Sequence, residues 1–198
     1  MTNLKQLFLL LVLIGMSGTK ALAYNFSVEN DDGVTIYYNR INSKATSVTY
    51  RDGNYNSYSG VVRIPATVTY NNVTRTVKSI GYCAFRDGIG LTSVEIPNGV
   101  TSIGEYAFYG CTSLTSINIP DGVTSIAIYA FYNCSSLTSI NIPDGVTSIG
   151  EGAFGYCSGL SSINIPDAVT SIGSYLFNNC SSLNSINIPD GVTSIAIY

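Results

Sequence analysis

Four cysteines recur at a constant interval and are the first candidates for chemistry in this chain: Cys111, Cys134, Cys157 and Cys180. If the segments that carry them stack, the thiols form a straight column, whereas tetrahedral zinc needs four sulfurs that converge on one ion at about 2.3 Å. Two adjacent thiols could still form a disulfide, which requires Cα atoms about 5.5 Å apart. We expect a ladder of small buried thiols and no bound metal. Cys83 lies outside the column and is the odd thiol.

Four aspartates recur at the same interval, each directly after a proline: Asp121, Asp144, Asp167 and Asp190. Carboxylates about 5 Å apart in a column could bind calcium. Calcium-binding β-rolls supply several oxygens from each coil, whereas here each turn offers one aspartate. Because Pro-Asp-Gly is typical of turns, we expect a turn-forming role, and weak binding of a divalent ion stays open.

The sequence contains no set of residues that predicts catalysis. A cysteine or serine nucleophile needs a nearby base, and the chain has no histidine. The carboxylates recur one per repeat instead of pairing across a cleft, and the glycines recur at turns instead of forming one phosphate-binding loop. We therefore predict a protein that is not an enzyme and needs no cofactor.

The charge distribution excludes two classes of partner. The chain has 9 basic and 12 acidic side chains, and no lysine or arginine occurs from Val100 to Tyr198. Such a surface repels phosphate, so nucleic acid and anionic lipid are not expected partners.

The segment Met1–Ala23 has the pattern of a cleavable signal peptide. A weakly basic start precedes the apolar run Leu7–Met16, and Ala21-Leu22-Ala23 is a small-x-small cleavage signal, so we predict a cut after Ala23. The apolar run is too short to span a bilayer, which takes about 20 residues. The sequence thus predicts a protein that is secreted or on the cell surface, without a membrane span.

A repeat of constant length decides the predicted architecture. Each copy opens on a valine that we number position 1: Val77, Val100, Val123, Val146, Val169 and Val192. Isoleucine recurs at positions 4, 18 and 20, phenylalanine at position 9 and leucine at position 15. No single copy can bury these side chains, but stacked copies make one continuous core, so residues 77–198 are expected to form a leucine-rich-repeat solenoid of five full coils and a partial sixth.

Within each coil, alternating β-branched residues predict a short parallel strand, for example over 115–119, which ends at Pro120. Val-Thr-Ser-Ile predicts a second brief extended segment. We expect a turn of helix or 3₁₀-helix over 105–111 as the corner that closes the coil.

Residues 24–76 do not repeat and are predicted to form a small β-rich N-terminal cap. Short strands are expected at 26–28, 34–38, 46–50 and 61–64, and Asn71-Asn72 is expected to join a hairpin of 67–70 and 73–77.

The repeat resembles a known family. Leu114 through Cys134 matches the string L-x-x-I-x-I-P-x-x-V-x-x-I-G-x-x-A-F-x-x-C apart from Ala127 in the glycine place. This string is similar to the short leucine-rich repeat of BspA-like bacterial surface proteins, and the resemblance covers residues 77–198, with a similar lead-in over 61–81. It implies exported or surface-attached proteins that bind host extracellular matrix, host cells or other microbes, and it offers no catalytic residues.

Two surfaces are candidates for ligand contact. Tyrosines gather near the predicted corner, at Tyr106, Tyr109, Tyr129 and Tyr132, together with Tyr156 and Tyr175. Tyrosine combines a large contact area with a polar tip, which suits recognition, although packing between coils explains the pattern equally well.

The outward strand positions carry an uncharged Ser/Asn lattice of Ser116, Asn118, Ser139, Asn141, Ser162 and Asn164, continued by Ser185 and Asn187. Identical contacts could gain strength by avidity, or the face could simply keep the sheet soluble.

The sequence leaves two functions open. The first is an adhesin-like binding protein for a protein or glycan ligand on a host or microbial surface. The alternative is a structural spacer, or a shortened copy of a longer surface protein without its own ligand. Residues 192–198 repeat 123–129 and then stop partway through a coil. We therefore expect an open strand edge near 185–188, with Ile195 and Ile197 beside it, and we expect this edge to fray or self-associate. We also expect the chain to derive from a longer array.

Overall fold

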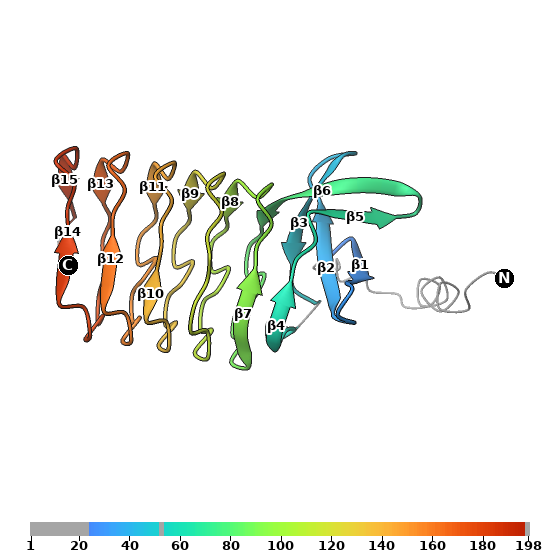
Figure 1. The fold of residues 1–198 in the computed structure, drawn as a ribbon, viewed down its shortest axis with the longest axis horizontal. Helices are drawn as coiled ribbons and strands as arrows, with labels where there is room; N and C mark the ends of the chain where they lie inside the picture. Colours follow the sequence, from blue (N-terminus) through green and yellow to red (C-terminus); the bar gives the residue numbers. More distant parts are fainter. Residues whose placement is uncertain (1–23, 52–53, 197–198) are drawn as a thin grey trace, which may run out of the picture.

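A stack of similar coils makes up most of the molecule (Figure 1). The structure is a computed structural model that describes residues 24–51 and 54–196. Residues 24–76, which we call the lead-in from here on, lie at one end of the stack, and the last coil lies at the other. This confirms the predicted leucine-rich-repeat solenoid, while the signal peptide predicted over 1–23 lies outside the described residues.

The lead-in forms the strands that the alternating residues predict. They are β1 (Phe26–Glu29), β2 (Thr35–Arg40), β3 (Ala45–Thr49), β4 (Gly60–Arg63), β5 (Thr67–Tyr70) and β6 (Val73–Ile80). β5 and β6 pair as an antiparallel hairpin. Asn71 and Asn72 have φ angles of 50° and 58°, the left-handed values that a two-residue type I′ turn requires at both positions. Asparagine tolerates this conformation well, which explains the Asn-Asn loop.

The lead-in is joined to the stack by parallel pairing. β3 pairs with β6, and β4 pairs with β7 (Leu91–Glu95) of the first coil. The first strands of the stack therefore have neighbours on their N-terminal side. That residues 24–76 act as a protective cap stays a prediction.

Each coil contributes two short parallel segments. The segments near the start of each coil form β8 (Ser102–Ile103), β9 (Ser125–Ile126), β11 (Ser148–Ile149), β13 (Ser171–Ile172) and β15 (Ser194–Ile195). The segments that precede the proline turn form β10 (Ser139–Ile140), β12 (Ser162–Asn164) and β14 (Ser185–Asn187). Paired residues differ by one repeat, as in Ser102 with Ser125 and Ser162 with Ser185.

The strands that precede the proline turns are shorter than predicted. Over 115–119 only Asn118 is bridged, to Glu95 on one side and Asn141 on the other. The hydrogen bond from the amide of Thr115 to the carbonyl of Thr92 is long, at 3.4 Å. Within this segment, parallel pairing is therefore limited to the part closest to the proline turn.

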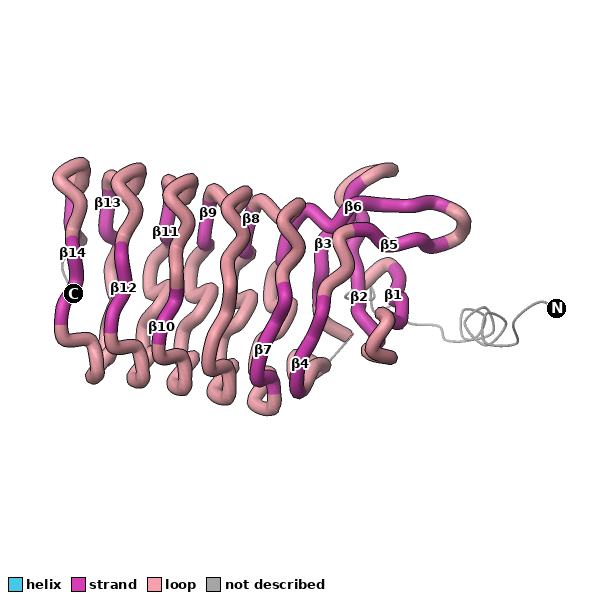
Figure 2. Tube along the Cα trace, viewed as in Figure 1, coloured by secondary structure: helices cyan, strands magenta, loops and turns pink. Residues whose placement is uncertain are grey.

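The predicted helical corners are wrong: the described residues contain turns and no helix there (Figure 2). Along the corner, amides bond alternately within the coil and to the next coil. The amide of Ala107 donates to the carbonyl of Gly104, but the amide of Phe108 donates to the carbonyl of Ala130 at 2.7 Å. A helix would direct all these amides into its own turns, so the bonds between coils replace it.

The core consists of columns of identical side chains. The phenylalanines at position 9 stack with ring centroids 5.0 Å apart for Phe85 with Phe108 and for Phe108 with Phe131. Phe131 is fully buried, and the position 15 leucines from Leu91 to Leu160 are fully buried as well. This confirms the predicted division between inward and outward positions.

At the C-terminal end of the stack, Ile188 of the fifth coil is 43% exposed and Ile195 of the partial sixth is 59% exposed. Self-association through this end stays a prediction.

We predict that Phe131→Ala lowers the free energy of unfolding by about 3–5 kcal/mol, because it leaves a cavity between two stacked rings. Asn141→Ala changes an exposed side chain and should stay within about 0.5 kcal/mol. Urea unfolding of both variants measures this. Equal shifts of the two midpoints would contradict the division between core and surface.

Candidate functional site

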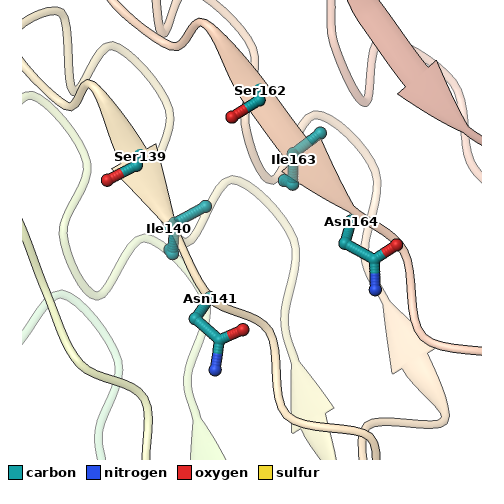
Figure 3. Close-up of a pocket in the computed structure, with 6 residues that line it drawn as sticks. All are labelled: Ser139, Ile140, Asn141, Ser162, Ile163 and Asn164. Carbon is teal, nitrogen blue, oxygen red and sulfur yellow. The ribbon is translucent and has the colours of Figure 1, made fainter.

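Serine and asparagine side chains form one continuous exposed surface, which we call the Ser/Asn face. β10 and β12 run side by side in register, so Ser139 lies next to Ser162, and Asn141 occupies the place that matches Asn164 (Figure 3). All four side chains are exposed, whereas Ile140 and Ile163 between them are 6% exposed. These six residues line a shallow, open depression. Alternation along the strand thus turns the polar residues outward and the isoleucines into the core.

The Ser/Asn face extends in both directions along the stack. Exposed Ser116 and Asn118 precede it, and Ser185 and Asn187 follow on β14. The structure therefore brings together all six serines and asparagines that the sequence singled out.

The face begins at a charged cluster on the lead-in side. Glu95 takes the asparagine place in the first coil, and its carboxylate lies 2.9 Å from Arg63, which also contacts Asp32 at 3.1 Å. These exposed ion pairs contribute little to stability, but they place the charges of this face at one end.

The second candidate surface is a row of rings, the tyrosine array, made of Tyr82, Tyr106, Tyr109, Tyr129, Tyr132 and Tyr156. The rings of Tyr109 and Tyr132 stack at 5.1 Å with an interplanar angle of 5°. Tyr106, Tyr109, Tyr129 and Tyr132 do lie together, and their other ring contacts are tilted or edge-on. Tyr106, Tyr109, Tyr129 and Tyr132 are half-buried, so they pack between coils, and a role in ligand contact stays a prediction.

Two electrostatic effects act on the array. The hydroxyl of Tyr129 donates a 3.0 Å hydrogen bond to the Glu151 carboxylate, which raises the pKa of Tyr129. Burial raises the pKa of Tyr132. Both phenols therefore stay protonated at neutral pH.

Position 7 of every full coil has left-handed backbone, which the sequence analysis missed. The φ angles are 54° at Cys83, 56° at Tyr106, 53° at Tyr129, 57° at Gly152 and 58° at Tyr175. This conformation is unfavourable for a bulky residue. The available signal was Gly152, a glycine in a column of tyrosines, because glycine adopts such angles freely.

Arg86 is a second residue that the sequence analysis missed. Its guanidinium carbon lies 5.0 Å from the ring centroids of Tyr55 and Tyr109 and 5.5 Å from that of Tyr106. Cation–π contacts of this kind are stabilising. Arg86 thereby links the lead-in loop that carries Tyr55 to the tyrosine array.

The column of cysteines lies inside the stack and does not form a surface. Each thiol donates to the carbonyl of the phenylalanine in the preceding coil, for example Cys134 to Phe108 at 3.2 Å and Cys157 to Phe131 at 3.1 Å. All five cysteines are free thiols, and Cys180 alone is half-buried while the others are buried. Burial raises the pKa of Cys111 and of Cys157 to about 12.

Within the described part of the chain, no group of three or more histidine, cysteine or acidic side chains could hold a metal ion. Over the same residues, no helix has the length and apolar character to cross a membrane.

The family model described as "BspA type Leucine rich repeat region" matches residues 67–198 in six copies. The chain belongs to this BspA-type leucine-rich repeat family. No curated protein matches it significantly. The BspA-type match begins inside the lead-in, at the first strand of the β5–β6 hairpin.

Solved structures of bacterial repeat proteins resemble this BspA-type chain. A leucine-rich cell surface protein from Faecalibacterium prausnitzii is 35% identical over 86% of this chain, with a TM-score of 0.72. A leucine-rich repeat protein of T. pallidum is 25% identical over 90% of this chain and 81% of its own length, with a TM-score of 0.65. One from Bacteroides ovatus is 29% identical over 87% of this chain and 55% of its own, with a TM-score of 0.56. The chain spans 45% of the Faecalibacterium protein.

The thiol column predicts a specific loss of stability at high pH. The folded chain keeps the thiol protons of Cys111 and Cys157 to about pH 12, whereas an unfolded thiol loses its proton near pH 8.5. Stability is therefore full below about pH 8.5 and falls as the pH rises from there, by up to about 1.4 kcal/mol per pH unit for each thiol.

Urea unfolding across this pH range measures the loss, with Cys157→Ser as the comparison. The serine hydroxyl can donate to the same carbonyl of Phe131 and does not titrate, so the variant should lose stability less steeply. Alkylation of the four column thiols should also be slow before unfolding and rapid after it. Equal slopes for the two proteins, together with immediate labelling of the native chain, would contradict the buried ladder.

Proposed function

We propose that this chain is an exported, non-catalytic adhesin-like protein that binds a protein or glycan on a host or microbial surface through the Ser/Asn face. One observation carries the proposal: four neighbouring coils present the same exposed serine and asparagine in register, with no charge among them. Such a face offers identical hydrogen-bonding groups about 4.8 Å apart. Weak contacts repeated along one ligand add up through their effective concentration.

The Ser/Asn face supports binding better than the tyrosine array does. Its side chains are exposed and lie around an open depression, so a partner reaches them without rearrangement. In the tyrosine array, Tyr106, Tyr109, Tyr129 and Tyr132 are half-buried, and the rings of Tyr109 and Tyr132 stack on each other. We place Tyr106, Tyr109, Tyr129 and Tyr132 as secondary contacts at most.

Export and surface location are part of the same proposal. The segment Met1–Ala23 has the pattern of a signal peptide, and the similar Faecalibacterium protein is described as a cell surface protein. Neither nucleic acid nor an anionic membrane suits a chain without a basic residue from Val100 onward.

The test compares two double variants that make the same change on different segments. Ser139→Arg with Ser162→Arg places two bulky cations on the Ser/Asn face. Ser148→Arg with Ser171→Arg makes the same change at exposed first residues of β11 and β13, outside the face. The exported chain is first surveyed against matrix proteins and glycans, and the best ligand is then measured with both variants.

We expect the first variant to lose binding at least tenfold, a difference of about 1.4 kcal/mol, and the second to bind like the unmodified chain. Equal loss in both variants would contradict the assignment of the face. A chain that binds no ligand in the survey would favour the alternative of a structural spacer.

A further inference from the structure

The tyrosine array has a hub at its centre. The ring of Tyr132 lies 5.1 Å from that of Tyr109, 5.3 Å from that of Tyr129 and 5.0 Å from that of Tyr156. Tyr109 and Tyr156 belong to the coils on either side. One residue therefore has tyrosine partners in its own coil and in both neighbouring coils.

The backbone holds these partners at a fixed separation. The amide of Gly110 donates to the carbonyl of Tyr132 at 2.8 Å, and the amide of Asn133 donates to the carbonyl of Gly155 at 2.8 Å. In the unfolded chain a full repeat of the sequence separates Tyr109 from Tyr132, so folding greatly raises the effective concentration of one phenol near the other.

Apart from its tyrosines, the chain offers few competing residues for a one-electron oxidant. It has no tryptophan and no histidine, and its two methionines, Met1 and Met16, lie in the predicted signal peptide. Four of the five thiols are buried. The outer edge of the array is accessible by contrast, because Tyr82 is 52% exposed and Tyr156 is 41% exposed.

We propose that the tyrosine array is a site of oxidative cross-linking, in which Tyr132 forms a carbon–carbon bond with Tyr109 or Tyr156 of a neighbouring coil. The oxidant is hydrogen peroxide acting through a peroxidase. Each of two phenols loses one electron and its hydroxyl proton, and the two radicals couple at ring carbons next to the hydroxyl. The proton on each coupled carbon then moves to the ring oxygen, which restores both phenols. Two hydrogens leave in total, and one peroxide takes them up to give two waters.

The product is a second covalent link between neighbouring coils, which are otherwise connected by the peptide chain, packing and hydrogen bonds. It goes beyond ligand binding, because it modifies the protein itself. A surface protein with such a link should unfold at a higher temperature, since the bond restricts the unfolded chain as a disulfide does.

The experiment treats the exported chain with peroxidase and hydrogen peroxide, then cleaves it on the N-terminal side of Asp121 and Asp144. This cleavage puts Tyr109, Tyr132 and Tyr156 on three different peptides. We expect dityrosine fluorescence, a monomer on a denaturing gel, and joined peptides that weigh two hydrogens less than their sum and whose fragment masses place the link at residue 132. Tyr132→Phe keeps the ring and should abolish these joined peptides.

Tyr70→Phe is the matched control, because it removes a hydroxyl from a half-buried ring whose stacking partner is Phe26. It should leave the joined peptides unchanged. Absence of dityrosine in the native chain would overturn the proposal. So would the same joined peptides at equal yield after oxidation in urea, or links that form mainly between molecules.

Discussion

Every coil is held at an offset of one repeat from its neighbours by backbone hydrogen bonds, and the rest of the structure depends on this register. The amide of Thr124 donates to the carbonyl of Thr101 on one side of the coil, and the amide of Phe108 donates to the carbonyl of Ala130 at the corner. Because the offset equals the sequence period, identical side chains lie above one another. The phenylalanine stack, the thiol column, the Ser/Asn face and the tyrosine array are four results of the same register.

Much of this arrangement could be predicted from the sequence. The period placed Phe131 and Leu137 inside and Asn141 outside, because no coil can bury its apolar residues alone. The Asn71-Asn72 turn was predictable as well, since asparagine accepts the left-handed backbone that a tight hairpin needs. The Ser/Asn face followed from alternation along a strand whose other side is core.

The remaining features depend on partners that lie far away in the sequence. Local pattern favoured a helical turn at the corners, but the carbonyls of the next coil capture alternate amides, and that competition is invisible within the corner segment alone. Tyr129, which has a left-handed φ angle, takes part in the same bonding, because its amide donates to the carbonyl of Glu151 in the next coil. Arg86 could not be assigned a role, because its partner Tyr55 comes from the unrepeated lead-in and only the fold brings the two together.

Deletion of one complete coil tests the register most directly. Removal of residues 123–145 joins Gly122 to Val146 and preserves every column, whereas removal of residues 123–134 joins Gly122 to Ser135 and shifts the later segments out of phase. The account predicts that the first variant folds and unfolds cooperatively in urea with reduced stability, and that the second does not fold. If both variants fail to fold, or both unfold alike, the fixed offset between coils does not determine the structure.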